Sequence, residues 1–198
     1  MLNMDPYVYP GTDVLKNLRD IRDQDSLNKA EAIATTRRLT ELYLKPKASK
    51  FDIPHLQSIH HHIFQDIYPW AGKFSQVNIA RSGQFFFAFH EQIPSVLNQT
   101  FQGLNTDQHL ANGDPAKFAN RAAYYLGELN AIHPFRDGNR RTQREFVRQL
   151  ALHHKYHLNW FQVSRDQMYK ASEQSFHRGD NQGLEDAIVR ALANDPIS

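Results

Sequence analysis

The sequence predicts an all-α fold, a single helical bundle that carries one small β-hairpin. Apolar residues recur at spacings of three and four through most of the 198 residues, which is typical of helices with one buried face. The exception is two β-prone runs, 77–80 and 85–89, on either side of a segment that contains glycine. No internal repeat, low-complexity tract or interior linker divides the sequence, so we expect residues 1–198 to form one domain.

Capping residues indicate where the helices begin and end. Asp25 or Ser26 would cap the first helix, and the pair Asp114–Pro115 would open the central one. The segment 164–167 reads as a capping box, and Gly179 suits the end of the helix that follows it. The expected helices cover residues 26–44, 53–67, 91–104, 115–132, about 140 onward, 164–177 and 181–193.

The two β-prone runs predict a hairpin over about residues 74–91, with its turn in 81–84. Phe85, Phe87 and Phe89 alternate, so one face of the second strand could be packed. A lone hairpin is only marginally stable in water, so this one must lie on the helices. From the residues alone, a purely structural hairpin remains an alternative to a functional one.

The most informative segment is 133–144, which reads HPFRDGNRRTQR. Pro134 disfavours helical geometry at His133, so the preceding helix should end there. The triplet 137–139 is typical of a turn, because glycine and asparagine tolerate positive φ. A new amphipathic helix begins near Arg140, so the loop leads into a helix N-terminus, whose free N–H groups and positive dipole end can bind an anion.

This segment combines the parts that phosphoryl or nucleotidyl transfer onto a hydroxyl requires. Arg141 and Arg144 are three residues apart and project to the same side of the helix, which suits a polyphosphate. Asp137 offers the hard oxygen ligands that suit Mg²⁺ shared with phosphate oxygens. His133 is the nearby group whose usual pKa allows proton abstraction near neutral pH. The alternative is an arginine-rich, solvated helix start after an ordinary loop.

The segment 133–144 resembles the Fic motif, which reads His, any, Phe, any, Asp or Glu, Gly, Asn, Gly or Lys, Arg, any, any, Arg. Every position matches but one, because Arg140 stands where Fic adenylyltransferases usually have Gly. Residues 9–12 are similar to the N-terminal segment of bacterial Fic toxins, and residues 56–72 to the family's central helix and the turn after it. The resemblance covers about residues 7–192 and implies the Fic fold, with the hairpin as a flap beside the active-site loop.

The resemblance implies AMPylation, in which AMP passes from ATP to a Ser, Thr or Tyr hydroxyl of a protein and pyrophosphate leaves. It implies that His133 deprotonates the hydroxyl and that Asp137 holds Mg²⁺. Gly138 and Asn139 would form an anion nest for the phosphates, and the Asn139 side chain would also steady the α-phosphate. Arg141 would bind the β-phosphate region, and Arg144 would bind the γ-phosphate.

Arg140 is a further candidate for nucleotide binding, and it leaves the reaction open. A bulky residue at this position could crowd the α-phosphate or require different backbone angles. Doc-type toxins, a related branch of phosphotransferases that bind ATP in a flipped orientation, have Lys here and Ala at the position of Gly138. This chain keeps Gly138 yet carries a cation at 140. AMPylation is the first hypothesis, and the alternatives are Doc-like transfer of the γ-phosphate and a weakened or inactive binding module.

The resemblance also implies two protein partners. The flap would hold a target segment by adding it as an extra strand. Many Fic proteins contain an inhibitory helix with Ser or Thr four places before a Glu, which pairs with the motif's last arginine, here Arg144. The threonines at 35, 36 and 40 lack that Glu, and residues 191–198 carry no such motif. We therefore expect a separate small antitoxin that supplies the glutamate, as in the toxin–antitoxin class of Fic proteins.

Composition and charge argue against several other classes. The formal net charge of +2 and the lack of a dense basic block do not support direct nucleic-acid binding. The sequence has no cysteine, no apolar run that could span a membrane and no signal-peptide pattern, so a bacterial cytoplasmic protein is expected, with secretion as an effector left open. The adjacent histidines 60–62 would point in different directions on a helix, so we expect no metal site there and place His60 in the core.

Overall fold

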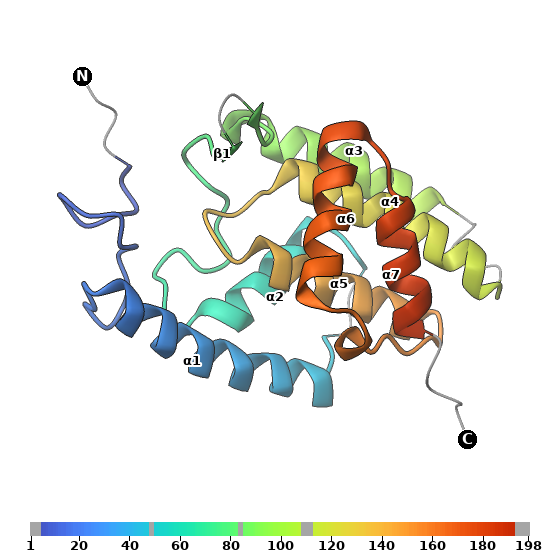
Figure 1. Ribbon diagram of the computed structural model, residues 1–198, viewed down its shortest axis with the longest axis horizontal. Coiled ribbons are helices and arrows are strands. Elements are labelled where there is room, and N and C mark those ends of the chain that lie inside the picture. The colour runs from blue at the N-terminus through green and yellow to red at the C-terminus, as the bar shows by residue number, and fades with distance from the viewer. Residues whose placement is uncertain (1–4, 48–49, 83–84, 108–112, 193–198) are drawn as a thin grey trace.

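The computed structural model describes residues 5–47, 50–82, 85–107 and 113–192. Within these ranges the chain is mostly helical, and its sheet has two antiparallel strands. The predicted all-α fold with one hairpin is confirmed (Figure 1). The helices are α1 Gln24–Leu44, α2 Ile53–Phe64, α3 Ile93–Thr106, α4 Pro115–Ile132, α5 Asn139–His153, α6 Arg165–Arg178 and α7 Gln182–Leu192.

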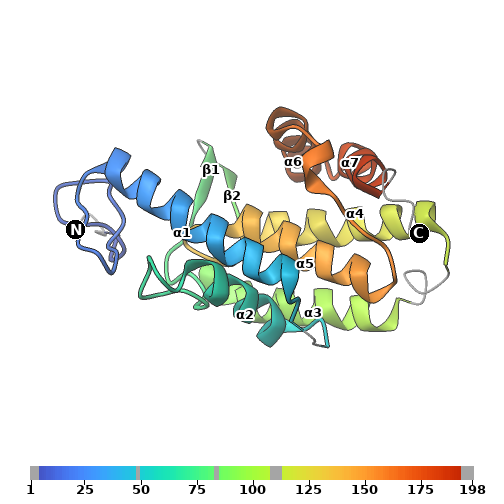
Figure 2. The ribbon, with the colours of Figure 1, turned by 90° about the horizontal axis from the view of Figure 1, so that it is seen from below.

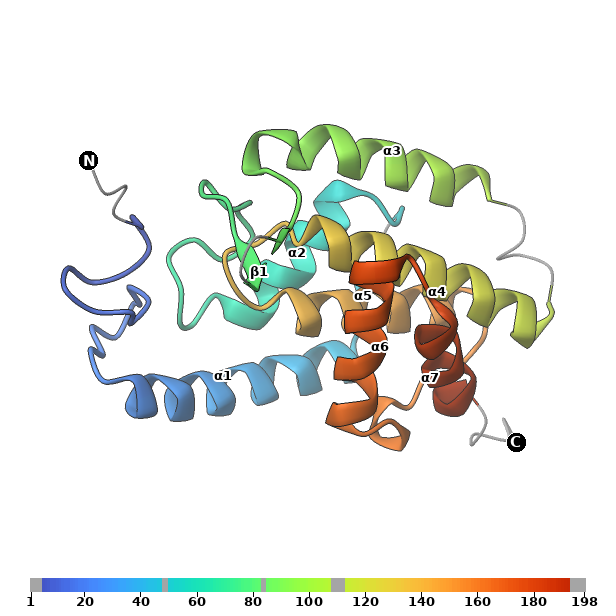
Figure 3. The same ribbon diagram turned by 45° about the horizontal axis from the view of Figure 1, so that its top comes forward.

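Helices α4 and α5 form the centre of the bundle. They run side by side, with α2 and α3 on one side and α6 and α7 on the other (Figure 2). Helix α3 runs along α4, and the long α1 packs on α2 at the periphery (Figure 3). The buried apolar residues form one cluster, and Phe64, Phe118, Phe135 and Phe146 are among its largest side chains. The connection between α4 and α5 therefore lies directly against the core.

Capping confirms several of the predicted helix ends. Helix α4 begins at Pro115, and the Asp114 carboxylate accepts two backbone N–H groups of its first turn. Helix α6 follows the predicted capping box, in which Ser164 and Gln167 exchange side-chain and backbone hydrogen bonds. The same helix ends at Gly179 in left-handed geometry, with φ of 65°.

Several predicted helix boundaries were wrong by one to three residues; helix α3, for example, is Ile93–Thr106 rather than 91–104. Helix α1 begins early, because Asp23, rather than either predicted residue, accepts the N–H of Ser26 at 2.8 Å. Helix α2 ends at Phe64 rather than at 67. The reason is that the N–H groups of Ile67 and Tyr68 both return to the Phe64 carbonyl, which closes a turn instead of extending the helix.

The hairpin is shorter than predicted and begins later along the chain. Strand β1 is Ala80–Ser82 and strand β2 is Phe85–Phe86, with an irregular register between them. The predicted turn residues 83–84 lie outside the described ranges. A 3-10 turn, η1 His90–Gln92, follows the hairpin and leads into α3.

The predicted packing of alternate phenylalanines was wrong. Phe87 is buried, whereas Phe85 and Phe89 are about half exposed. The strand ends at Phe86, so the alternation of a strand does not continue to the residues beyond it. Among these three alternating rings only that of Phe87 is buried, and it lies in the candidate site.

Candidate active site

The loop between α4 and α5 carries the segment that was predicted to be functional. Helix α4 ends at Ile132, directly before its left-handed C-cap His133, whose φ is 51°. The predicted end of this helix ahead of Pro134 is confirmed, although His133 is left-handed rather than extended. The chain then turns through Gly138, with φ of 79°, into the first turn of α5. We call residues 133–138 the motif loop. The predicted order of helix, loop and helix is confirmed.

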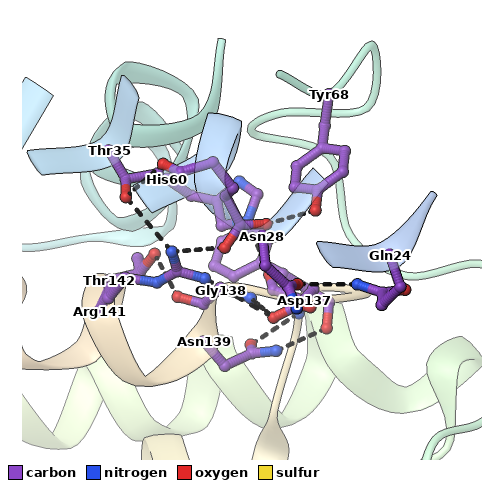
Figure 4. A network of polar contacts seen from close by, with 12 residues as sticks. Gln24, Asn28, Thr35, His60, Tyr68, Asp137, Gly138, Asn139, Arg141 and Thr142 are labelled. Atoms are coloured by element: carbon purple, nitrogen blue, oxygen red, sulfur yellow. Dashed lines mark hydrogen bonds and ion pairs between the residues drawn. The ribbon is translucent and has the colours of Figure 1, made fainter. Parts of the chain in front are cut away.

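A buried histidine of α2 holds the motif loop in place (Figure 4). His60 Nδ1 accepts the Gly72 N–H at 2.8 Å, so its Nε2 carries the proton and donates to the Asp137 carbonyl at 3.0 Å. The His60 ring also stacks on Phe135, with 3.8 Å between ring centroids. Burial lowers the pKa of His60 to about 3, so the ring is neutral at pH 7. The expected core position of His60 is confirmed, and its contact with the loop is new.

The side chain of Asn139 closes the motif loop on itself. Its Oδ1 accepts the Phe135 N–H at 2.9 Å, and its Nδ2 donates to the Phe135 carbonyl at 2.6 Å. Asn139 is nearly fully buried in this position. The contact between this side chain and the α-phosphate, which the resemblance implied, would have to coexist with these two hydrogen bonds.

Gly138 lies where no other residue fits without a shift. A Cβ on Gly138 would come within 2.3 Å of the Phe64 ring, and the positive φ is unfavourable for L side chains. The close approach of Phe64 from α2 thus explains why this chain has glycine at the position where Doc-type proteins have alanine.

A cavity of about 700 Å³ opens beside the motif loop, within the usual size range of small-ligand sites. The fold brings all of the predicted site residues to its lining: His133, Asp137, Gly138, Asn139, Arg140, Arg141 and Arg144. Strand β1 and helix α6 complete the wall, through Arg81, Arg165, Met168, Tyr169 and Glu173. The sequence analysis missed these last five residues, because they lie far from the motif along the chain and belong to no motif of their own.

The first turn of α5 faces this cavity without a side-chain cap. Its first backbone hydrogen bond runs from the Thr142 N–H to the Gly138 carbonyl, at 3.1 Å. The N–H groups of residues 139–141 therefore precede the intrahelical ladder. Free N–H groups at the positive end of a helix are suited to binding an anion.

The two arginines predicted to bind phosphate differ in their surroundings. Arg141 forms an ion pair with Glu31 of α1 at 2.7 Å, and its guanidinium carbon lies 4.6 Å from the centroid of the Phe64 ring. Arg144 donates to the Arg140 carbonyl at 3.3 Å and has no ion pair within the described ranges. Burial, followed by the charges of Arg141 and Arg140, lowers the pKa of Arg144. A polyphosphate in the cavity would relieve this repulsion.

Arg140 is accommodated by α6. Its guanidinium carbon lies 5.2 Å from the centroid of the Tyr169 ring, a cation–π contact across the cavity. The residue is part of regular helix, with no positive φ. Arginine at this position therefore requires no unusual backbone angles, and it adds a cation to the lining.

Asp137 is partly exposed at the cavity edge and suits an Mg²⁺ ion shared with phosphate. Its Oδ1 accepts the Gly138 N–H, and Arg141 Nη2 lies 3.9 Å from the same oxygen. In the part of the chain that the structure describes, no group of three or more His, Cys, Asp or Glu side chains could enclose a metal ion. A single carboxylate is the donor set of an Mg²⁺ that takes its other ligands from phosphate oxygens and water.

His133 lies on the cavity wall next to the hairpin. Its ring stacks on Phe87 with 3.7 Å between centroids, and its Nδ1 is buried. Burial is the main cause that lowers the pKa of His133 to about 3. The positive charges of Arg81 and Arg140 lower this pKa further, whereas the hydrogen bond to the Asn130 carbonyl raises it. The imidazole is therefore neutral at pH 7, with Nε2 as the nitrogen available to accept a proton.

The hairpin is anchored on both α4 and α6. Ala88 donates its N–H to the Ala131 carbonyl of α4 at 3.2 Å. Arg81 of β1 donates through Nε to Glu173 of α6 at 2.7 Å, and its guanidinium carbon lies 4.7 Å from the centroid of the Phe176 ring. These contacts place β1 along one edge of the cavity, beside His133.

The fold and the site define a helical protein in which an uncapped helix start and three arginines line one cavity. The model of the Fic/DOC family matches residues 50–151, and curated relatives with more than 30% identity extend over nearly the whole chain. The chain therefore belongs to the Fic/DOC family.

The relatives include named enzymes. The chain is 43% identical over 186 residues to protein adenylyltransferase VbhT of Bartonella schoenbuchensis, which covers 94% of this chain but 38% of that protein. It is 36% identical over 181 residues to the probable protein adenylyltransferase Fic of Escherichia coli, which covers 91% of this chain and 88% of that protein. The chain is thus an enzyme of the Fic/DOC family and is similar to relatives that are named protein adenylyltransferases.

Solved structures agree in fold. BepC, a VirB-translocated Bartonella effector protein from Bartonella tribocorum with bound AMPPNP, has a TM-score of 0.86 and 25% identity, over 93% of this chain and 95% of that one. The N-terminal Fic domain of a VirB-translocated effector from Bartonella quintana with bound ADP has a TM-score of 0.88 and 27% identity, over 93% of both chains. Among the described residues, no helix has the length and apolar character needed to cross a membrane.

Proposed function

We propose that this protein transfers AMP from ATP to a hydroxyl side chain of a target protein. One observation carries the proposal: a single cavity joins the neutral His133 to the uncapped start of α5 and its arginines. A base and a polyanion site on one wall are what transfer of a nucleotidyl group to a hydroxyl needs. The named relatives and the nucleotide-bound neighbours support the same activity.

In the proposed reaction, the target hydroxyl oxygen attacks the α-phosphorus of ATP. The bond between that phosphorus and the oxygen bridging to the β-phosphate breaks, and pyrophosphate leaves. His133 takes the hydroxyl proton at Nε2. The bound phosphates would raise the pKa of His133 from its value in the free protein, because negative charge favours the imidazolium.

The remaining site residues would bind the nucleotide. Gly138 and the first N–H groups of α5 would receive the phosphate oxygens, and Arg141 and Arg144 would neutralise the pyrophosphate that forms. Asp137 would hold Mg²⁺, which supplies charge neutralisation at the phosphates when bound.

We propose that the flap selects the target. Strand β1 borders His133, and a short two-stranded sheet can accept an extended segment as a further strand. The exposed rings of Phe85, Phe86 and Phe89 lie on the same hairpin segment and would contact such a segment.

We further propose that the enzyme is the toxin of a toxin–antitoxin pair. Arg144 has no carboxylate partner in the described ranges, and the sequence lacks the inhibitory motif that would provide one internally. A small antitoxin would supply that glutamate. Such a pair would act in the bacterial cytoplasm; the VirB-translocated structural neighbours support delivery as an effector as the alternative.

Arg140 favours a second candidate, Doc-like transfer of the γ-phosphate. The extra cation over Tyr169 could change how the triphosphate lies in the cavity. A label-transfer experiment separates the two reactions. The protein is incubated with Mg²⁺ and bacterial lysate, once with α-labelled and once with γ-labelled ATP. Label only from the α position supports AMP transfer, and label only from the γ position supports phosphotransfer.

His133→Ala is the decisive variant in that experiment. Loss of a general base lowers the rate by about 10²- to 10⁴-fold, while ATP binding measured by calorimetry should remain. His157→Ala, at an exposed histidine, is the matched control and should transfer label like the wild type. Unchanged transfer by His133→Ala would show that the base has been misassigned.

Arg140→Gly restores the residue that Fic adenylyltransferases usually have. If Arg140 crowds the nucleotide, this variant transfers AMP faster than the wild type. If Arg140 is a phosphate contact, AMP transfer falls and the KM for ATP rises. Arg140→Ala is measured beside it, since glycine in a helix costs about 1 kcal/mol relative to alanine.

A further inference from the structure

Helix α1 does not line the cavity, yet two of its side chains contact Arg141, and Figure 4 shows Thr35 facing its guanidinium. Glu31 Oε1 is 2.7 Å from Arg141 Nη1. One helical turn later, the Thr35 hydroxyl oxygen accepts from the same nitrogen at 3.4 Å. This side of the guanidinium is therefore occupied by α1.

Glu31 is itself held in place. The Tyr68 hydroxyl donates to Glu31 Oε2, the oxygen that does not face Arg141. Burial and the charge of Glu31 raise the pKa of Tyr68, so the hydroxyl stays protonated and remains a donor. The Tyr68 ring stacks on Trp70 with 4.4 Å between centroids, which fixes the donor from behind. Both carboxylate oxygens of Glu31 are thus engaged.

The remaining surfaces of Arg141 are then defined. Phe64 lies under its plane, and Nη2 is directed to the motif loop, 3.9 Å from Asp137 Oδ1. A guanidinium has five N–H donors in one plane, so those not used by Glu31 and Thr35 can point into the cavity together. Arg144 has no comparable support, since its hydrogen bond goes to a carbonyl of its own helix.

We propose that Glu31 is a positioning residue for Arg141: it keeps the guanidinium oriented toward the nucleotide phosphates and stays paired with it when ATP is bound. This inference rests on the proposed function only in taking ATP as the ligand. A flexible arginine side chain loses rotamer freedom when it binds, and Glu31 removes most of that freedom in advance.

A double-mutant cycle tests the proposal. Glu31→Ala, Arg141→Ala and the double variant are compared with the wild type. MgATP binding is measured by calorimetry, and KM and kcat by AMP transfer. Misplacement of a binding group costs on the order of 10- to 100-fold, so we expect Glu31→Ala to weaken MgATP binding about tenfold. In the Arg141→Ala background the same change should have almost no effect, because Glu31 acts through Arg141.

Two further variants keep the test decisive. Glu31→Gln retains an oxygen that can accept from Arg141, so it should recover most of the affinity even if Glu31→Ala folds poorly. Glu41→Ala removes another paired glutamate of α1, one that contacts Arg37 and Arg38 and does not line the cavity, and should leave MgATP binding unchanged.

Three outcomes would overturn the proposal. An equal loss of affinity in both backgrounds would mean that Glu31 has a purely structural role. Tighter MgATP binding by Glu31→Ala would mean that Glu31 competes with phosphate for Arg141. A wild-type protein that binds no ATP would remove this proposal and the proposed function together. If the wild type binds ATP but transfers no AMP, only the proposed function fails, and the binding cycle still decides the role of Glu31.

Discussion

The two sides of the cavity are built in opposite ways. The motif loop is held by buried groups: His60 binds its backbone, Asn139 closes it, and Phe64 packs directly against Gly138. The flap presents exposed phenylalanines to solvent, and its principal side-chain anchor is the contact between Arg81 and Glu173.

This difference corresponds to the two molecules that the enzyme would bind. The nucleotide is always the same, so its side of the cavity can be held rigidly by the core. The target is a protein segment whose side chains vary, so its side benefits from a hairpin that can adjust. The comparison predicts that changes on the motif side cost stability and activity together, whereas changes on the flap affect target use with little cost in stability.

His60→Leu should have the largest effect, because it breaks the motif side directly. The variant leaves the Gly72 N–H and the Asp137 carbonyl without their partner. Each unpaired buried group costs about 1–3 kcal/mol, so we expect the free energy of unfolding to fall by about 4 kcal/mol in urea titrations. AMP transfer should fall by on the order of 100-fold, since Asp137 moves with its loop.

His61→Leu is the matched control for His60→Leu. His61 is the next residue on α2 and is exposed, so its replacement should change neither stability nor activity appreciably. If the two variants behaved alike, the motif loop would not depend on His60.

Gly138→Ala should have the next largest effect. The added Cβ would meet the Phe64 ring and would have to adopt a positive φ. Strain of these two kinds together costs about 3 kcal/mol. Phe64→Leu removes the clash but not the unfavourable φ, so Gly138→Ala should cost less in a Phe64→Leu background. Equal costs in both backgrounds, again from urea unfolding, would assign the whole effect to the backbone.

Acid should weaken the motif side through His60. The pKa of His60 is about 3 in the folded protein against 6.5 for the unperturbed group. Between these values the unfolded chain binds more protons at this site, so the free energy of unfolding rises with pH and falls on acidification. One such group contributes at most about 2 kcal/mol of loss between pH 7 and pH 5. Urea unfolding at pH 7 and pH 5 measures this loss. In His60→Leu, the decrease in the free energy of unfolding between the two pH values should be smaller than in the wild type by about 2 kcal/mol.

The motif side is also the part that the sequence predicted well. His133, Asp137 and the three arginines lie within twelve residues, so helix periodicity and turn chemistry alone place them together. Helix ends with strong caps, such as Asp114 and Ser164, were found for the same reason. Local interactions determine these features, and local interactions can be read from adjacent residues.

The contacts that could not be predicted are long-range. Glu31 and Arg141 are on different helices, and Arg81 and Glu173 are 92 residues apart. No periodicity pairs one charged side chain with another at that distance. The prediction from the alternation of Phe85, Phe87 and Phe89 was wrong for a related reason. Phe87 is buried because it packs on the rings of His133 and Phe176, which are distant in sequence, and not because of its place in a strand.

Glu173→Gln should have the smallest effect on stability and the most selective effect on function. The amide oxygen can still accept from Arg81, but the charge that faces this buried guanidinium is lost, so the free energy of unfolding should fall by about 1 kcal/mol. Weaker attachment of β1 to α6 should speed hydrogen exchange in residues 79–82 and 85–87 and leave exchange in the motif loop unchanged. The KM for the target should rise several-fold, while MgATP affinity stays within about twofold of the wild type.

Glu185→Gln is the control for Glu173→Gln, because this α7 glutamate accepts from Asn120 away from the cavity. If Glu173→Gln slowed AMP transfer through kcat at saturating target, the flap would be part of the rigid side of the cavity, and the contrast between the two walls would not hold.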